Sequence, residues 1–302
     1  MVSLVFGTSE YVCREDFLLE TDLAHPIKGP PGLVSLWQGD QMVLAYYIGY
    51  FSPKHSVFRY LECISKCYHY YKSRFAEKTL LVHFHGWSTG FGKVLLADVL
   101  RITQPSHIIE YYKNEVTHPE VLKETSSLLE GFFYSVTPKV TVSKSKDKNK
   151  GDLKFERANN LETYFGKVGR SIADTYTKLV PYSRFYTQLK IVLNGELMSE
   201  ELYRGLLGKI CGLCKVTGEC LGIGIIRDIN FETGLIYVLA KVEDLSEAEV
   251  VQVVSGEGCL EMCKHSLWDE FFFGKFETEP QGMLFLTTMT DTLQKRHPPK
   301  KS

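Results

Sequence analysis

The chain has 302 residues, of which 44% are hydrophobic and 24% charged, and its formal net charge is −1. This composition predicts a globular protein with a core large enough for one large domain or two unequal domains. No run approaches the roughly 20 apolar residues that span a bilayer, and the N-terminus lacks the regions of a signal peptide, so we expect an intracellular protein. The near-neutral charge excludes recruitment of nucleic acid by the whole surface, and a polyanion would need a local basic patch.

The first half of the sequence alternates apolar strand patterns with helical patterns. Strands are predicted at 17–23, 44–50, 79–84 and 107–112, and helices at 57–75 and 91–102. This alternation is typical of βαβ units and predicts a parallel sheet with flanking helices. Pro and Gly residues at 25–32 predict a long, stiff loop after the first strand. Because ligands of such sheets bind beyond the carboxyl ends of the strands, Asp22 and the loop 86–92 are expected at the same edge.

The segment VHFHGWSTGFGKVLLADVL (82–100) is close to a phosphate-binding loop, since its glycines are followed by Lys93. The nucleotide-triphosphate motif is GxxxxGK followed by Ser or Thr, in which backbone N–H groups wrap the phosphates. Here Trp87 occupies the first glycine position and Val94 the hydroxyl position. The segment therefore predicts a strand, a turn and a helix without a standard phosphate cradle. A plain Gly-rich connection between core elements is the alternative.

A change of composition follows at 141–154, TVSKSKDKNKGDLK, which is rich in lysine. This segment is interpreted either as a solvated insertion or as an arm that binds a polyanion. Beyond it, the patterns predict a helix at 155–176, strands at 188–193, 210–216, 220–242 and 250–254, and a hairpin turn at 230–234. The last residues, KRHPPKKS, predict a disordered basic end.

The eight cysteines raise the question of metal or disulfide sites. Cys63 and Cys67 lie four apart in a helical pattern, where reduced cysteine acts as a small hydrophobe. Cys211 and Cys214 form a lone CxxC followed by Cys220, without a second pair at zinc-finger spacing and without a nearby histidine. The spacing favours buried core cysteines over a zinc or redox site.

Five segments of the chain, taken in order, carry a family resemblance. They are LLETDLAHPIKGPPGLVSL (18–36), YYIGYFSPKHSVFRYLECI (46–64), LLVHFHGWSTGFGKVLLADVLRITQPSHII (80–109), CLGIGIIRDIN (220–230) and GLIYVLAKV (234–242). Together they resemble the polynucleotide 5′-hydroxyl kinases of the nucleolar, pre-rRNA-processing type, which are related to the kinase subunit of the messenger-RNA cleavage machinery. The resemblance implies an α/β fold, with a P-loop-kinase-like parallel sheet and flanking helices followed by a β-rich C-terminal domain.

The same resemblance implies a division of the chain into four parts. They are a partial P-loop kinase-like α/β domain at 1–140, a basic loop and lid-like helix at 141–180, a β-rich C-terminal domain at 181–280 and a disordered basic tail at 281–302.

Kinases of this type transfer the γ-phosphoryl group of ATP, with Mg²⁺, to the 5′-hydroxyl of an RNA end, a reaction that depends on positioning and charge neutralisation. Their strand-end ExD pattern matches Glu20 and Asp22. By resemblance, Asp22 holds the metal with its water shell or accepts the proton of the attacking hydroxyl, and Glu20 supports it. From the sequence alone, a carboxylate at a strand tip is equally well an anchor for a loop or helix terminus.

Trp87 matches a tryptophan of the family, whose indole could stack on a terminal base. Gly86, Gly90 and Lys93 would belong to the same substrate-binding loop, whereas a tryptophan beside a strand is otherwise a core residue. Arg157 matches an arginine of the helix that closes over the phosphates, where a guanidinium neutralises charge in the transition state. A solvated helix arginine is the alternative.

The phosphate-binding motif of the family is not matched. Gly7 follows an apolar strand pattern as the motif requires, but VCR (12–14) stands where glycine, lysine and a hydroxyl residue belong, and no helix fits before Phe17. The asparagine and threonine that usually precede GW are replaced by HF (83–84). Without the lysine and the amide cradle, the β- and γ-phosphates lose most of their ligands. We therefore expect either a truncated or alternatively spliced version of such a kinase or a degenerate copy of it.

Two functional hypotheses follow. The first is an ATP-dependent polynucleotide 5′-hydroxyl kinase that acts on the 5′ ends of pre-rRNA in the nucleolus. The second is a non-catalytic RNA- or protein-binding scaffold of the same complex, which docks the pre-rRNA endonuclease partner of these kinases. The incomplete motif favours the scaffold, the ordered segments favour descent from a kinase, and enzymatic activity is left open.

Overall fold

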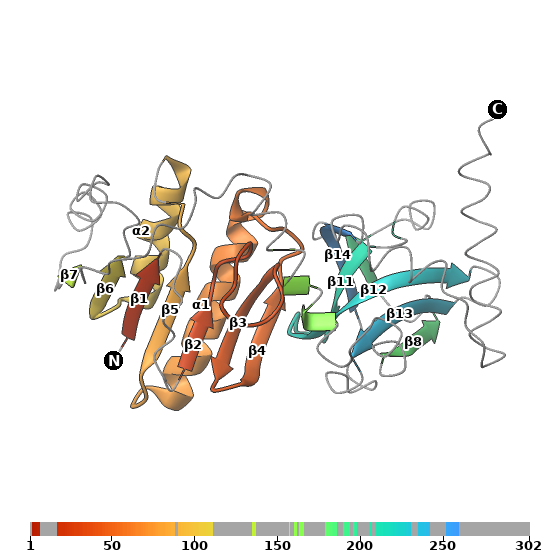
Figure 1. The fold of residues 1–302 in the computed structure, drawn as a ribbon, viewed down its shortest axis with the longest axis horizontal. Helices are drawn as coiled ribbons and strands as arrows, with labels where there is room; N and C mark the ends of the chain where they lie inside the picture. The colour runs from red at the N-terminus through yellow and green to blue at the C-terminus, as the bar shows by residue number, and fades with distance from the viewer. Residues whose placement is uncertain are drawn as a thin grey trace. The chain divides into compact units, whose positions relative to one another are not determined.

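The computed structural model describes residues 2–6, 17–87, 90–110, 135–136, 157, 160–161, 163–165, 179–185, 190–193, 196–197, 206, 209–230, 235–241 and 252–259. The chain divides into two compact units, one made of residues 1–160 with 217–220 and one made of 161–216 with 221–302. Each unit is built around one sheet (Figure 1). No helix within the described ranges is long and apolar enough to cross a membrane.

The first unit contains a seven-stranded sheet of order β4-β3-β2-β5-β1-β6-β7. Its strands are β1 (Val2–Phe6), β2 (Phe17–Glu20), β3 (Leu33–Gln38), β4 (Gln41–Tyr47), β5 (Leu80–Phe84), β6 (His107–Glu110) and β7 (Ser135–Val136). Strands β2, β5, β1, β6 and β7 are parallel neighbours, which confirms the predicted parallel core. The sheet as a whole is mixed, because β3 runs antiparallel to both β2 and β4.

The antiparallel edge is a hairpin that the strand and helix alternation did not predict. Strands β3 and β4 are joined by only Gly39 and Asp40, and Gly39 has a φ of 55°. Two-residue hairpin loops require positive φ, which glycine adopts without the penalty that a Cβ imposes. The tight turn therefore returns the chain directly beside β3, and the strand predicted at 44–50 is observed as β4, antiparallel to its neighbour.

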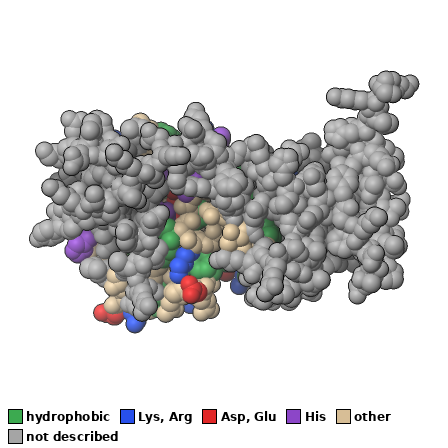
Figure 2. Space-filling model, in the orientation of Figure 1, with side chains coloured by type: hydrophobic (Ala, Val, Ile, Leu, Met, Phe, Trp, Pro, Cys, Tyr) green, Lys and Arg blue, Asp and Glu red, His purple; other side chains and the backbone are tan. Residues whose placement is uncertain are grey.

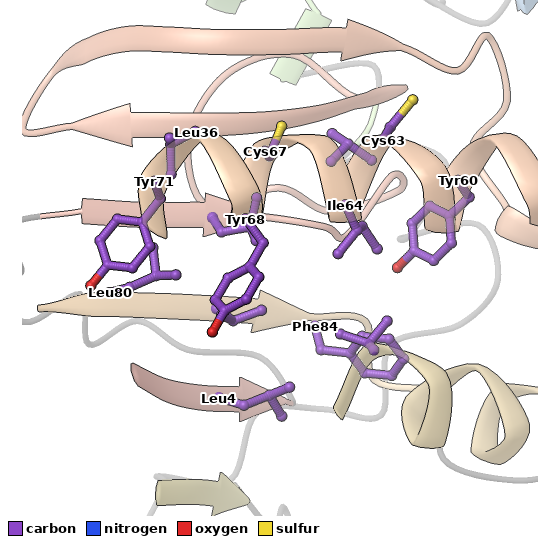
Figure 3. Close-up of a cluster of buried hydrophobic side chains, with 14 of the residues drawn as sticks. Leu4, Leu36, Tyr60, Cys63, Ile64, Cys67, Tyr68, Tyr71, Leu80 and Phe84 are labelled. Atoms are coloured by element: carbon purple, nitrogen blue, oxygen red, sulfur yellow. The ribbon is translucent and has the colours of Figure 1, made fainter. Parts of the chain in front are cut away.

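Helices α1 (Val57–Phe75) and α2 (Phe91–Thr103) confirm the two helices predicted in the first half, and a short 3₁₀ helix η1 (Pro53–His55) precedes α1. The buried face of α1 recurs at helical spacing and comprises Tyr60, Cys63, Ile64, Cys67, Tyr68 and Tyr71. Figure 3 shows these side chains directed towards the strands, where they join Leu80 and Phe84 in one core cluster. Cys63 and Cys67 are thus core residues as predicted, and burial raises the pKa of the Cys67 thiol.

Alternation along β2 and β5 sends neighbouring side chains to opposite faces of the sheet. Phe17 and Leu19 belong to the core cluster that contains the buried residues of α1 and α2, whereas Leu18 joins Leu81 in a second, smaller cluster. Glu20 and His83 follow Leu18 and Leu81 by two residues each, so they project to the face opposite α1 and α2. The sheet therefore places two polar side chains at the end of its buried second face.

The second unit is rich in strands, as predicted, and its sheet has the order β10-β9-β14-β11-β12-β13-β8. The strands are β8 (Leu179–Phe185), β9 (Lys190–Leu193), β10 (Glu196–Leu197), β11 (Lys209–Cys214), β12 (Cys220–Asn230), β13 (Leu235–Lys241) and β14 (Gln252–Cys259). The predicted hairpin is confirmed by the antiparallel pairing of β12 with β13. Cys211 and Cys214 lie buried in β11, and no group of three or more metal-ligating side chains occurs among the described residues.

Three further expectations concern parts of the chain that are described sparsely or not at all. Within the helix predicted at 155–176, Arg157 and residues 160–161 and 163–165 are helical. The basic segment 141–154 and the tail 281–302 lie outside the described residues.

Candidate functional site

The candidate site lies where β2 and β5 end side by side. The two strands are parallel and in register, with Glu20 opposite His83. The Thr21 N–H then donates to the His83 carbonyl at 3.0 Å, and the Thr21 hydroxyl donates to the same oxygen at 2.6 Å. Strand β4 ends at this edge too, because two antiparallel pairings bring Tyr47 to the Leu33 end of β3.

Glu20 and His83 form an inner pair at this edge, and both are buried. Glu20 Oε1 lies 2.6 Å from His83 Nδ1 and accepts the Asp22 N–H at 3.0 Å. Glu20 Oε2 accepts the Ile27 N–H at 2.7 Å. A buried carboxylate is tolerated when such bonds replace its hydration. Glu20 therefore fixes the start of the loop after β2 and orients His83.

Asp22 lies two residues beyond Glu20 and also closes the loop. Its Oδ1 accepts the N–H groups of Ala24 at 2.8 Å and His25 at 3.0 Å, which is the local pattern that Asp favours in turns. Both bonds use Oδ1, and Oδ2 takes part in neither. Asp22 is thus a loop anchor, as the sequence alone allowed, and still offers one carboxylate oxygen to a ligand.

His85 lies two residues beyond His83, just after the end of β5, in the position that corresponds to that of Asp22 after the end of β2. Its side chain is 7% exposed, and its Nδ1 accepts the Trp87 N–H at 3.2 Å. Because a neutral imidazole carries one proton, this bond assigns the proton to Nε2. His85 Nε2 is buried and has no hydrogen-bond partner within the described ranges. Burial lowers the pKa of His85 to about 4, although the Asp22 charge raises it, so the ring is neutral at physiological pH.

Trp87 presents an exposed indole next to these groups. It is 36% exposed, and its ring centroid lies 6.0 Å from that of His85 and 5.9 Å from that of Phe91. A Cβ on Gly92 would lie 2.2 Å from the Trp87 carbonyl oxygen and 2.6 Å from its ring Cγ. Only glycine at 92 lets the indole lie this close to α2.

The other residues of the loop 86–92 and the first turn of α2 lie next to Trp87 in the sequence. Gly86 is exposed, and Gly90 caps the helix with a φ of 54° and no side-chain bond. Lys93 is partly buried, and its N–H donates to the Gly90 carbonyl at 3.2 Å. The loop predicted to bind substrate therefore places Gly86, Trp87, Gly90 and Lys93 at the same edge as Asp22.

Arg157 reaches this edge of the sheet from a distant part of the sequence. Its guanidinium carbon lies 5.5 Å from the centroid of the Phe51 ring, an arrangement typical of a cation–π contact. Phe51 follows β4, which ends at the carboxyl edge of β2 and β5. The structure thus places Asp22 and Trp87 at adjacent strand ends and Arg157 beside the end of β4.

The position that a nucleotide would occupy can be compared with the residues present. Strand β1 lies between β5 and β6, at the point where the strand order reverses and such sheets bind ligands. Ten residues, 7–16, link β1 to β2, and none of them is lysine. A phosphate loop followed by a crossover helix needs a dozen residues or more. The sequence of this link therefore lacks the lysine of the standard triphosphate motif.

The described charges show no single-sign patch on the face drawn in Figure 2. There, blue and red side chains lie next to one another. The formal net charge of the whole sequence is −1.

Sequence reasoning missed two residues of this edge, His85 and Gly92. The HFH pattern at 83–85 does alternate polar side chains on one face of β5, which is a usable signal. The role of Gly92 depends on the approach of Trp87, which no sequence pattern encodes.

Comparisons with known proteins agree with this architecture. A sequence model of the family described as mRNA cleavage and polyadenylation factor CLP1 P-loop matches residues 14–167. A second, described as NOL9-like, C-terminal domain, matches residues 177–260.

Several relatives carry the name polynucleotide 5′-hydroxyl-kinase. NOL9 of Arabidopsis thaliana is 26% identical over 293 residues, covering 81% of this chain and 78% of that protein. NOL9 of Bos taurus is 27% identical, covering 48% of this chain and 21% of that protein. GRC3 of Saccharomyces cerevisiae is 30% identical, covering 34% of this chain and 16% of that protein. The chain therefore matches most of the plant protein and only a small part of the other two.

Two solved structures of Clp1p with Pcf11p share the fold. They superpose with TM-scores of 0.62 and 0.60 at 14% identity, covering 85% of this chain and 74% of theirs. The P-loop-kinase-like fold predicted from the sequence is thus confirmed.

Proposed function

The chain belongs to the CLP1 P-loop family, and on that premise we propose that it binds the 5′-hydroxyl end of RNA at the carboxyl edge of β2 and β5. The relatives named polynucleotide 5′-hydroxyl-kinase support this substrate class. The observation that carries the proposal is the exposed Trp87 indole beside Asp22 and His85, at the strand ends where such sheets bind ligands.

In this proposal each residue of the edge has a separate task. Trp87 stacks on the terminal base, which is a sequence-tolerant contact. Asp22 accepts a hydrogen bond from the terminal hydroxyl through Oδ2, while Glu20 holds the Asp22 N–H in place. Arg157 and Lys93 neutralise backbone phosphates, and the glycines at 86 and 90 leave room for the chain of the RNA to pass.

Phosphoryl transfer is a separate question from RNA binding. The resemblance implies ATP and Mg²⁺, but the link 7–16 contains no lysine. Of the two described carboxylates at this strand end, Glu20 uses both oxygens in hydrogen bonds, whereas Asp22 uses Oδ1 for the loop. We therefore propose that the chain by itself binds RNA ends without tight ATP binding. This favours the second candidate function, a non-catalytic scaffold.

The biological setting follows from the relatives rather than from the geometry. We propose action on pre-rRNA ends in the nucleolus, with the segment 177–260 as the docking part for a pre-rRNA endonuclease. The match of this segment to the NOL9-like C-terminal domain supports that assignment.

RNA binding is tested by measuring the affinity of a single-stranded RNA decamer with a 5′-hydroxyl at two salt concentrations. Trp87→Ala should weaken binding by about 1–3 kcal/mol, because one base loses its stacking partner. Tyr70→Ala is the matched control, since Tyr70 is an aromatic residue in the last two turns of α1 and is not part of the proposed site. Equal affinities for Trp87→Ala and the parent would overturn the proposed site.

The basic segment gives a second arm of the same experiment. Replacing the lysines of 141–154 by glutamine should weaken binding with little regard to sequence and flatten the salt dependence, because each neutralised phosphate releases counterions. An unchanged salt slope would identify the segment as a solvated insertion.

Nucleotide binding is tested by titrating labelled ATP in the presence of Mg²⁺. We expect no micromolar binding to the chain alone. Micromolar affinity that is lost in Lys93→Ala would instead place the nucleotide at the loop 86–93.

A further inference from the structure

One acid and histidine pair lies on β2 and β5, a second lies just beyond their ends, and the two differ in how completely they are bonded. In the inner pair, both oxygens of Glu20 accept hydrogen bonds, one of them with His83. In the outer pair, Asp22 Oδ2 takes part in neither loop bond and His85 Nε2 is buried without a partner in the described part of the chain. A buried N–H without an acceptor is destabilising, because it has lost its hydrogen bonds to water and gained none in return.

The unused atoms of the outer pair are complementary. Asp22 Oδ2 can only accept a hydrogen bond, whereas His85 Nε2–H can only donate one when Nδ1 is occupied by the Trp87 N–H. The register sets Glu20 opposite His83 and bonds Thr21 to the His83 carbonyl, so Asp22 and His85, each two residues beyond the inner pair, leave adjacent strand ends. A group that both donates and accepts would satisfy both atoms at once.

A hydroxyl is such a group, whereas a dianionic phosphate can only accept hydrogen bonds. The hydroxyl hydrogen can go to the carboxylate while its oxygen accepts from the imidazole. A terminal phosphate carries between about −1.5 and −2 charges near neutral pH and would face the Asp22 carboxylate with repulsion. The neutral imidazole would add no positive charge to offset it.

We propose that His85 is a specificity-determining residue that, together with Asp22, holds the terminal hydroxyl of the RNA and rejects a terminal phosphate. This inference rests on the proposed function and deepens it, because it assigns the choice between the two kinds of RNA end to one hydrogen-bond donor. Trp87 links the two tasks: its backbone N–H orients the imidazole and its indole receives the adjoining base.

The test compares one RNA decamer bearing either a 5′-hydroxyl or a 5′-monophosphate, each titrated against the full chain by fluorescence anisotropy from a 3′ label. The parent should bind the hydroxyl end more tightly, by about three- to tenfold for one neutral hydrogen bond, with repulsion of the phosphate adding to the ratio. Asn at position 85 retains an acceptor near Nδ1 for the Trp87 N–H but lacks a donor at the place of Nε2. Gln reaches that place with its amide N–H.

Comparing His85→Asn with His85→Gln therefore separates the loss of the hydrogen-bond donor at Nε2 from a general disturbance of the loop around residue 85. We expect the preference for the hydroxyl end to decrease in His85→Asn by about three- to tenfold and to be largely restored in His85→Gln. His69→Asn, on the exposed face of α1, should leave the preference at the parent value. Far-UV circular dichroism of all variants establishes that they are folded.

The outcomes are distinguishable from failure of the proposed function. If the parent binds neither decamer, both proposals are wrong. If it binds both with equal affinity, RNA binding stands and the role of His85 is overturned. A preference that survives unchanged in His85→Asn would likewise overturn the role of His85.

Discussion

The inner pair, Glu20 and His83, lies on β2 and β5, and the outer pair, Asp22 and His85, lies two residues further along the same two chain segments; each pair joins a carboxylate to a histidine. The inner carboxylate is fully buried and both of its oxygens are bonded. The outer pair has one carboxylate oxygen outside the loop bonds and one imidazole donor without a partner among the described residues. The comparison separates groups that hold the strand ends together from groups that are left for a ligand.

The largest effect is expected from breaking the inner pair. Glu20→Ala leaves three donors without their acceptor, those of Asp22, Ile27 and His83, in a buried environment. The free energy of unfolding in urea should decrease by roughly 3–5 kcal/mol. Glu62→Ala is the matched control, because its exposed pair with Lys66 should contribute about 0.5 kcal/mol or less. A loss below about 1 kcal/mol for Glu20→Ala would contradict a structural role for the inner pair.

The outer pair should instead appear in the pH dependence of stability. The pKa of His85 is lowered in the folded protein to about 4, so the unfolded chain binds more protons between that value and the ordinary value of 6.5. The contribution of neutral His85 to the free energy of unfolding is therefore fully present above pH 6.5. It is lost as the pH falls towards 4, with an upper limit of about 3 kcal/mol. Subtracting the urea unfolding free energies of His85→Asn from those of the parent at pH 7, 5.5 and 4.5 isolates it. A difference that does not change with pH would show that His85 titrates normally.

The packing of Trp87 against α2 predicts a change in RNA-binding free energy that is no larger than the change in stability expected from His85. Gly92→Ala introduces a Cβ into the space of the Trp87 carbonyl and ring, so the indole must move. RNA affinity should fall by about 1–3 kcal/mol, as in Trp87→Ala, because the stacking platform is displaced. The double variant should lose no more than Trp87→Ala alone, which a double-mutant cycle detects. Additive losses would mean that Gly92 acts independently of the indole.

The smallest effect is expected from removing a hydrogen bond to the backbone of Thr21, the residue between Glu20 and Asp22. The Tyr60 hydroxyl donates to the Thr21 carbonyl at 3.1 Å inside the core, between Glu20 and Asp22 in sequence. Tyr60→Phe should reduce the unfolding free energy by about 1 kcal/mol, the usual value of one neutral hydrogen bond. An equal RNA affinity in this variant would confirm that the bond supports the loop without touching the ligand, whereas a large loss of affinity would place Tyr60 in the site.

Much of the fold of the first unit followed from periodicity in the sequence. The helices at 57–75 and 91–103 bury side chains at helical spacing over several turns, which makes such elements readable without a structure. Strand β3 was missed because LVSLWQ is short and mostly buried, and its antiparallel direction depends on a tight turn at Gly39. Antiparallel edges of this kind are set by turn geometry rather than by strand composition.

The site was less predictable than the fold. Asp22 and Trp87 could be selected because they match a family pattern and follow strands. The bond between Glu20 and His83 joins residues 63 positions apart, and the spare donor of His85 results from its burial and from the Trp87 N–H. The bond between Glu20 and His83 depends on the register of β2 against β5, which the sequence does not specify.

Binding of an RNA end beside Trp87 is the central claim, and fluorine NMR of the 5-fluorotryptophan-labelled protein tests it most directly. The chain has three tryptophans, and Trp87→Phe identifies the resonance of Trp87. Addition of the 5′-hydroxyl decamer should shift this resonance saturably and leave that of Trp37 unchanged, because the Trp37 indole N–H is already bonded to Ser35 and its ring packs against the smaller buried cluster of the sheet. A Trp87 resonance that does not move at saturating RNA would contradict the account.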